Sequence, residues 1–188
     1  MFDAVWGTPQ YDILSGSNLQ IIAEMTARVP MMHHTLHGYI SEYRVAESLL
    51  HSDGITNVTK RPTRQIHGRG GDLQFTYEHH DYLVEVKTLG AMRTLRNGRY
   101  SATVSTSPTR KSPLDPIRAY RHDVFDILAV NAASLGSPAI WYARVEDLPR
   151  HKANIDYLAG SMTTSNVCGF PFTLSIYDVL LQTVRSVS

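Results

Sequence analysis

Hydrophobic and polar residues alternate on both sides of a short polar stretch in the middle of the chain. Leu73, Phe75 and Tyr77 alternate with polar residues, and the segment 82–87 has the same period of two. Alternation of this kind is typical of strands with one buried face. The sequence therefore predicts two strands joined by a polar turn over 78–81.

Charged residues on this predicted hairpin suggest chemistry. With the turn centred on His79 and His80, we expect Asp72 to lie opposite Lys87 and diagonal to Glu85, within side-chain reach of both. Two neighbouring carboxylates destabilise a fold, because like charges repel and each group loses water. A divalent cation relieves this cost, and carboxylate oxygens suit magnesium. The ammonium group would orient or activate a water, or stabilise charge on a phosphate.

Upstream of the hairpin, the pattern predicts helices over 17–29 and 38–51, a turn at Asp53-Gly54 and a strand over 55–59. The order is therefore helix, strand, strand, strand. Within the second helix, Glu42 projects into the apolar arc. An acid in that position needs a partner.

Downstream, the pattern predicts a polar and basic region, then several buried strands, and then an irregular stretch over 160–171. The expected elements are strands over 100–105, 123–131, 139–144 and 172–176, a short helical turn over 145–149, and a final helix with Val179, Leu180 and Val184.

Two parts of this pattern resemble a known superfamily. Asp72, followed thirteen residues later by Glu85-Val86-Lys87, is similar to the PD-(D/E)XK motif of restriction-endonuclease-like nucleases, with Gly71 in place of the proline. The later stretch YRHDVFDILAVN…AIWYARVEDLP resembles the second half of the same core. Asp123 and Asp126 within it are interpreted as structural, not as metal ligands.

The resemblance covers about residues 38–149 and implies an α/β fold with a restriction-endonuclease-like core, a mixed β-sheet flanked by helices. The chain would then be one nuclease domain over 1–188. Residues 1–37 would form a helical N-terminal addition, and 150–188 a C-terminal addition for recognition or dimerisation.

The resemblance also implies an activity: a DNA endonuclease that depends on Mg²⁺, with Mn²⁺ as a substitute, and leaves 5′-phosphate and 3′-hydroxyl ends. Such enzymes often act as homodimers. The residues implied as catalytic are Asp72, Glu85, Lys87 and Glu42, with Glu47 as the alternative helix acid. The metal ligands implied are Asp72, Glu85 and Val86, the last through its carbonyl.

Charge distribution supports a nucleic-acid partner. The chain has 18 Lys and Arg against 17 Asp and Glu, a formal net charge of +1, but the segment 60–121 holds twelve bases and only five acids. A basic block around a metal site fits a phosphate-rich ligand such as DNA. The DNA-contact candidates are Arg61, Arg64, Arg69, Arg93, Arg96, Arg110 and Lys111.

Several alternatives stay open. Among nucleases, a type II restriction enzyme ranks narrowly before a homing endonuclease and a Holliday-junction or repair nuclease. A non-cleaving DNA-binding module on the same fold is a second class. A histidine metalloenzyme is a third, using the pairs among His33, His34 and His37 or His79-His80.

Length and targeting signals limit the setting. A chain of 188 residues suits one domain. We expect an intracellular, cytoplasmic protein of prokaryotic or phage-like type, because no secretory signal is visible and no apolar stretch approaches the roughly 20 residues that span a bilayer. Cys168 is alone, so a disulfide framework within one chain is not expected.

Overall fold

The structure is a computed structural model that describes residues 24, 28–61, 70–89, 93–94, 100–105, 119–132, 139–165 and 168–185. Most of the helix predicted over 17–29 lies outside these residues. Within the described part, no helix is long and apolar enough to cross a membrane.

A long helix, α3 (Pro30–Leu50), contains the helix predicted from residue 38 and begins eight residues earlier. Proline fits the first turn of a helix, because its fixed φ is helical and its missing N–H has no partner there in any case. Val45, Ala46 and Leu49 on this helix are buried. The helix ends before the predicted turn at Asp53-Gly54, where Gly54 has a φ of 75°.

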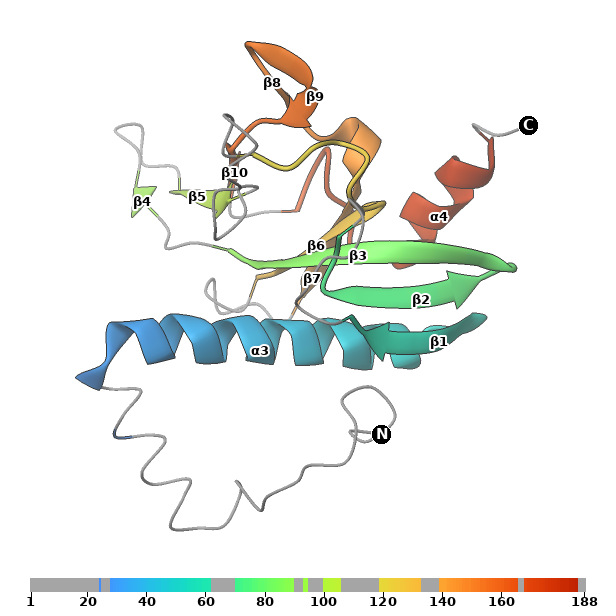
Figure 1. The fold of residues 1–188 in the computed structure, drawn as a ribbon, viewed down its shortest axis with the longest axis horizontal. Coiled ribbons are helices and arrows are strands. Elements are labelled where there is room, and N and C mark those ends of the chain that lie inside the picture. The colour runs from blue at the N-terminus through green and yellow to red at the C-terminus, as the bar shows by residue number, and fades with distance from the viewer. Residues whose placement is uncertain are drawn as a thin grey trace.

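The helix packs on a five-stranded sheet with the order β1-β2-β3-β6-β7 (Figure 1). The strand β3 pairs with β6 in parallel, and the other pairs are antiparallel. The sheet is therefore mixed, as expected. Its strands are β1 (Ile55–Lys60), β2 (Leu73–Tyr77), β3 (His80–Thr88), β6 (Ile127–Asn131) and β7 (Ile140–Arg144). The strand predicted from residue 123 begins only at Ile127, because the chain turns over residues 121–126.

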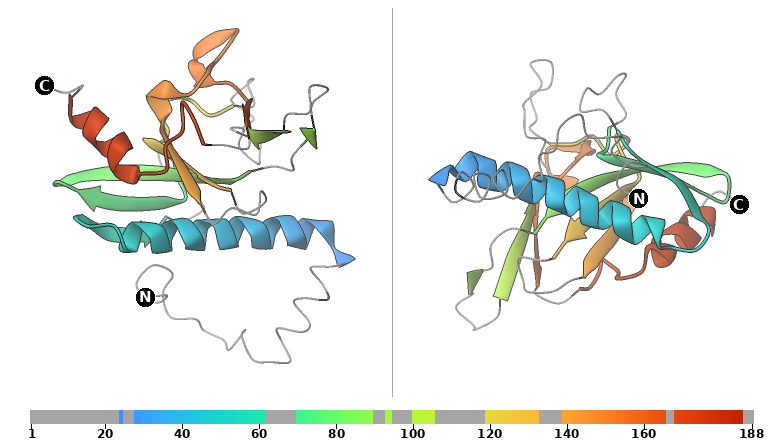
Figure 2. Two further views of the ribbon diagram at one scale, coloured as in Figure 1. Left: turned by 180° about the vertical axis from the view of Figure 1, so that it is seen from behind. Right: turned by 90° about the horizontal axis from the view of Figure 1, so that it is seen from below.

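Among the remaining described elements, the last helix contributes Ile176, Val179 and Leu180 to the same hydrophobic core as α3, and the others lie on the opposite side of the sheet (Figure 2). These remaining elements are a three-stranded sheet of β10 (Ser161–Ser165), β5 (Tyr100–Ser105) and β4 (Arg93–Thr94), a pair of β8 (Arg150–His151) and β9 (Asn154–Leu158), the 3₁₀ turn η2 (Val145–Asp147), and the last helix, α4 (Ile176–Arg185).

Two predictions for the C-terminal part are wrong. The stretch 160–171 was expected to be irregular, but it contains β10, which pairs with β5. The strand expected over 172–176 is absent, since Thr173 forms only an isolated bridge with Tyr142 and α4 begins at Ile176. Both outcomes depend on whether the segment pairs with a strand that is distant in the sequence.

Alternation along β2 and β3 separates two hydrophobic cores. Phe75 and Val84 belong to the core beneath α3, whereas Leu83 belongs to the core on the opposite face. Glu85 and Lys87 have the same parity as Leu83, so they lie on the face away from α3.

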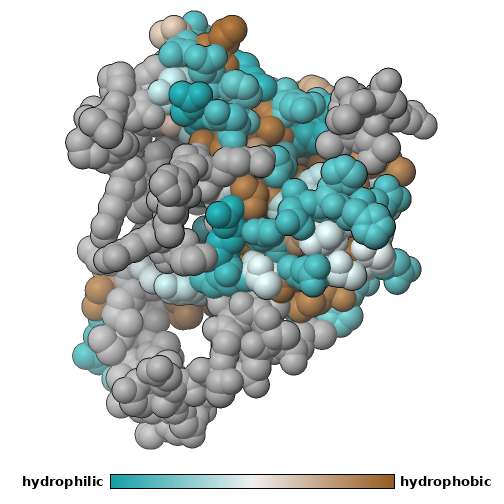
Figure 3. Space-filling view, turned by 45° about the vertical axis from the view of Figure 1, so that its right-hand side comes forward, coloured by the Kyte–Doolittle hydropathy of each residue, from teal (hydrophilic) through white to brown (hydrophobic). Residues whose placement is uncertain are grey.

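On the outer surface, the described residues in Figure 3 are mostly hydrophilic, with hydrophobic atoms near the β8–β9 pair at the top.

Polar hydrogen bonds fix α3 along the sheet. The buried Asn131 donates to the Ser41 hydroxyl at 2.9 Å and accepts from Arg44 at 3.2 Å. The Ser41 and Thr88 hydroxyls are 2.7 Å apart. Each such bond contributes about 1 kcal/mol, and an unpaired member would cost more. The network therefore sets the position of α3 against the ends of β3 and β6.

The turn between β2 and β3 corrects the predicted register. Its two central residues are Glu78 and His79, with φ angles of 47° and 66°, and Tyr77 pairs with His80. This two-residue loop begins one residue earlier than predicted. Each residue of β3 therefore pairs with a β2 residue two positions away from its predicted partner. Because the shift is even, every side chain keeps its predicted face.

This register pairs Leu73 with Val84. The regular pairing ends there: the Asp72 N–H donates to the Val84 carbonyl, and the Asp72 Oδ2 accepts from the Val86 N–H. The prediction that Asp72 lies opposite Lys87 is therefore wrong, because Asp72 lies beside residues 84–86.

The strained turn makes a stability prediction. Replacing Glu78 with Asn and His79 with Gly should stabilise the protein by about 1–2 kcal/mol, because a two-residue hairpin loop with positive φ at both positions favours Asn-Gly. His80→Gly is the control: it places glycine inside a strand and should destabilise by about 0.5–1 kcal/mol. Urea unfolding measures both, and a double variant less stable than wild type would contradict the account.

Candidate active site

Asp72 is held by two backbone hydrogen bonds at the start of β2. Its N–H donates to the Val84 carbonyl at 2.8 Å, and its Oδ2 accepts from the Val86 N–H at 2.8 Å. The N–H and C=O of a strand residue point the same way, so the Val86 carbonyl also faces this edge. Within the described part of the chain, no hydrogen bond falls on the second carboxylate oxygen, Oδ1, which could therefore take a ligand.

Gly71, directly before Asp72, has a backbone conformation that excludes proline. Its φ is 144°, which proline cannot adopt because its ring fixes φ near −65°. A Cβ at this position would lie 3.1 Å from the Val84 carbonyl oxygen. The chain therefore needs glycine to bring Asp72 close to β3.

Glu85, Lys87 and Tyr120 form a compact hydrogen-bonded group beside Asp72. The Lys87 ammonium donates to Glu85 Oε1 at 2.6 Å, and the Tyr120 hydroxyl donates to the same oxygen at 2.5 Å. The Lys87 ammonium is also 3.3 Å from the Tyr120 hydroxyl oxygen and 5.2 Å from the centre of its ring. Glu85 is only 4% exposed, so this carboxylate depends on these two donors.

Burial and neighbouring charges shift the protonation of Asp72. Burial, and after it the carboxylates of Glu85 and Glu42, raise its pKa to about 7, although the Val86 N–H and the Lys87 ammonium act against the rise. A carboxyl group with this pKa is poorly compensated in the protein alone. A bound cation would favour its charged form.

Glu42 does not join the hydrogen-bonded group. It forms an ion pair with Lys60, which lies across from Leu73 in the sheet and so has the α3-facing parity, whereas Glu85 and Lys87 lie on the other face. Glu42 is near enough to raise the pKa of Asp72. The alternative acid, Glu47, lines a separate cleft with Ser48 and Tyr142.

The donor set fits a hard divalent cation that keeps several waters. Asp72 Oδ1 and the Val86 carbonyl face one edge, and both described hydrogen bonds to the Glu85 carboxylate fall on Oε1, which leaves Oε2. Magnesium uses one or two carboxylates and completes its shell with water and phosphate oxygens. In the described part of the chain, no cluster of three or more His, Cys, Asp or Glu side chains could hold a metal.

Most of the predicted DNA contacts fall outside the described residues. These are Arg64, Arg69, Arg96, Arg110 and Lys111, together with the side chain of Arg93 in β4. Arg61 is described and lies at the site: its backbone N–H donates to the Asp72 carbonyl at 2.9 Å. The histidine metal site at His33 and His34 also lies on side chains that are not described.

Sequence reasoning missed Tyr120. This residue precedes β6 in the stretch that resembles the second half of the nuclease core, but no spacing rule connects it with Glu85, 35 positions earlier. Burial, and then the Glu85 carboxylate, raise the pKa of Tyr120 above its ordinary value. Its hydroxyl therefore remains a hydrogen-bond donor at neutral pH.

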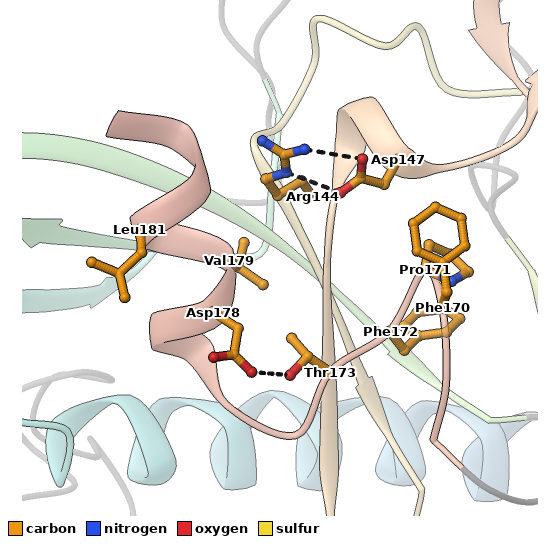
Figure 4. Close-up of a pocket in the computed structure, with 9 residues that line it drawn as sticks. All are labelled: Arg144, Asp147, Phe170, Pro171, Phe172, Thr173, Asp178, Val179 and Leu181. Atoms are coloured by element: carbon orange, nitrogen blue, oxygen red, sulfur yellow. Dashed lines mark hydrogen bonds and ion pairs between the residues drawn. The ribbon is translucent and has the colours of Figure 1, made fainter. Parts of the chain in front are cut away.

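A cleft of about 440 Å³ lies elsewhere, between η2, α4 and the segment before α4 (Figure 4). Arg144 in this cleft forms a bidentate ion pair with Asp147, and Thr173 donates to Asp178 at 2.5 Å. These charged side chains already have partners, so the cleft offers fewer groups for catalysis or ligand binding than the Asp72 site does.

The raised pKa of Asp72 predicts a pH dependence of stability in the cation-free protein. The folded carboxyl holds its proton up to about pH 7, whereas the unfolded one loses it near 4, so stability should fall as pH rises through this window. Asp72→Asn should remove this loss, and its stability advantage over wild type should grow by up to roughly 4 kcal/mol between pH 4 and 7. Urea unfolding in EDTA at several pH values measures it.

Asp123→Asn is the matched control for that experiment. Hydrogen bonding to Arg121 holds the pKa of this carboxyl below its usual value, so its contribution to stability is already present at pH 4 and above. Its variant should show no growing advantage between pH 4 and 7. Parallel pH profiles for Asp72→Asn and wild type would contradict the account of Asp72.

Gly71→Ala should destabilise the protein by about 1–3 kcal/mol, because the new Cβ meets the Val84 carbonyl and the φ is strained for any L-residue. Gly38→Ala is the control. Nothing lies within 4 Å of a Cβ at Gly38 in α3, and alanine there should stabilise by about 0.5–1 kcal/mol. Equal unfolding free energies for the two variants would refute the role of Gly71.

Comparisons with known proteins find a structural similarity to a homing endonuclease. No family model matches the chain, and a search of curated proteins also finds no match. The structure of a bacterial homing endonuclease, I-Ssp6803I, aligns with 81% of this chain and 95% of that chain, with a TM-score of 0.49 and 20% sequence identity. The chain is similar to that protein at this level.

Proposed function

We propose that the protein is a Mg²⁺-dependent DNA endonuclease that hydrolyses phosphodiester bonds at the Asp72 site. The observation that carries this proposal is the pair of neighbouring carboxylates, Asp72 and Glu85. The Glu85 charge raises the pKa of Asp72, and the Lys87 ammonium lies 2.6 Å from Glu85. A buried pair of acids beside one base is poorly suited to stability alone. It is well suited to a divalent cation next to a phosphate.

Each residue of the chain has a distinct role in this proposal. Asp72 Oδ1, Glu85 Oε2 and the Val86 carbonyl would hold the cation, and Mn²⁺ would substitute for Mg²⁺. The bound cation would supply charge stabilisation for the phosphate and lower the pKa of a coordinated water. Lys87 is placed to orient the attacking water or to stabilise negative charge on the phosphate.

Glu42 would act from the other side of the sheet. In the structure it is paired with Lys60, so its proposed part is to adjust the charge around Asp72 or a water near the cation. The basic segment 60–121 would contact the DNA backbone, since Arg and Lys pair readily with phosphates. A homodimer would place two such sites on the two strands.

The DNA sites that the enzyme cuts would identify its biological role. A restriction-type enzyme would cut at short repeated sequences, a homing endonuclease at one long site, and a junction or repair nuclease at a DNA structure. We consider a homing endonuclease and a restriction enzyme equally good candidates for a small chain with this site.

The test is cleavage of supercoiled plasmid and long genomic DNA with Mg²⁺, with EDTA, and with the Lys87→Ala variant. We expect nicking or linearisation that requires Mg²⁺ and falls by at least about 100-fold in Lys87→Ala, because an electrostatic group at the reacting phosphate contributes this much. Sequencing the ends should show 5′-phosphates and identifies the type of target.

Lys152→Ala is the control, because this exposed lysine lies in the turn between β8 and β9 and should leave the single-turnover rate near that of wild type. Cleavage that persists in EDTA, or in Lys87→Ala, would reject the assigned site. DNA binding without cleavage of plasmid, genomic or branched DNA would instead support a non-cleaving binding module.

A further inference from the structure

The Tyr120 hydroxyl contacts two of the three charged groups at the proposed site. It donates to Glu85 Oε1 at 2.5 Å and lies 3.3 Å from the Lys87 ammonium, which donates to it. The segment 119–126, to which Tyr120 belongs, is held against the neighbouring chain, since the Gly70 N–H donates to the Val124 carbonyl and the Leu83 N–H to Asp126 Oδ2, both at 2.8 Å. Tyr120 is the residue of this segment whose side chain contacts Glu85 and Lys87.

The surrounding structure holds this hydroxyl in place. The Tyr120 ring packs edge-on against Phe125, with 5.5 Å between ring centres, and Phe125 is almost fully buried. The Tyr120 carbonyl accepts from the Leu158 N–H in β9 at 2.8 Å. Because ring and backbone are both anchored, the position of the hydroxyl is set by the fold and not by Glu85 alone.

We propose that Tyr120 is a positioning residue that orients Glu85 for a divalent cation and provides Lys87 with a second acceptor. This inference rests on the proposed cation-dependent function and assigns a role outside the Asp72, Glu85 and Lys87 set. By binding Oε1, the hydroxyl keeps the carboxylate from rotating and leaves Oε2 as the ligand oxygen. Substitution of a residue that orients a metal ligand in this way commonly lowers metal affinity or activity by about 10- to 100-fold.

The second contact concerns Lys87. In the structure its ammonium shares Glu85 Oε1 with the Tyr120 hydroxyl, so it partly neutralises the carboxylate that a cation would bind. A neutral oxygen at 3.3 Å and an aromatic face at 5.2 Å allow the ammonium to move away from Glu85 without losing all its partners. Lys87 would then remain beside the reacting phosphate.

Tyr120→Phe tests the proposal, because it removes the hydroxyl and keeps the ring that packs on Phe125. Tyr142→Phe is the matched control: its hydroxyl donates to Ser48 at 3.0 Å beneath α3, away from the Asp72 site. Mn²⁺ binding without DNA is measured by calorimetry. Plasmid cleavage is measured as kcat and KM at saturating Mn²⁺, and thermal melting reports folding.

For Tyr120→Phe we expect Mn²⁺ affinity and kcat each to fall by about 10- to 100-fold, with KM for DNA unchanged and melting similar to that of Tyr142→Phe. Tyr142→Phe should match wild type in Mn²⁺ affinity and kcat. Affinity and kcat of Tyr120→Phe within twofold of wild type would overturn the inference, as would equal losses in both variants.

Failure of the proposed function gives a different result. If wild type binds Mn²⁺ but cuts no DNA, the nuclease proposal falls, while weaker Mn²⁺ binding by Tyr120→Phe still supports the positioning role. If wild type binds no Mn²⁺, both proposals fall together.

Discussion

Two neighbouring carboxylates, the half-buried Asp72 and the buried Glu85, are the feature on which the site depends. Burial and mutual repulsion raise the pKa of Asp72, and Glu85 depends on donors from Lys87 and Tyr120. Such an arrangement is costly, because a buried charge requires a nearby opposite charge or hydrogen bonds. The other features of the site supply those partners or hold them in place.

The backbone makes the close approach of the two acids possible. Gly71 brings the chain within contact distance of the Val84 carbonyl, and the Val86 N–H then binds Asp72 Oδ2. The tight turn at Glu78-His79 sets the pairing of β2 with β3, which brings Asp72 beside residues 84–86. Strained φ angles at Glu78 and His79, and a φ at Gly71 that suits only glycine, are therefore associated with one chemical site.

The rest of the fold holds the two sides of this sheet. The Ser41, Thr88 and Asn131 network fixes α3 on one face, so Glu42 and Lys60 remain near the edge at which Asp72 lies. On the other face, Phe125 and β9 anchor Tyr120. Charges thus reach Asp72 from both faces of the sheet, although only Glu85, Lys87 and Tyr120 form the hydrogen-bonded group.

The sequence by itself determined the local elements and which face each side chain takes. The period of two along 73–77 and 82–87 is sufficient to place Glu85 and Lys87 on one face, because side-chain direction in a strand depends only on parity. The apolar arc of the helix over 38–51 and the buried strand at 127–131 are likewise local patterns. That the sheet is mixed was expected only from the resemblance to restriction-endonuclease-like nucleases.

Tertiary structure decided the features that depend on contacts between distant residues. The register of β2 against β3 differed by two from the prediction, since a two-residue turn can form at either neighbouring position and the sequence lacks a strong Asn-Gly signal. The contact between Tyr120 and Glu85, and the pairing of β10 with β5, join segments 35 or more positions apart. Such contacts depend on packing of the whole chain, so no local pattern could indicate them.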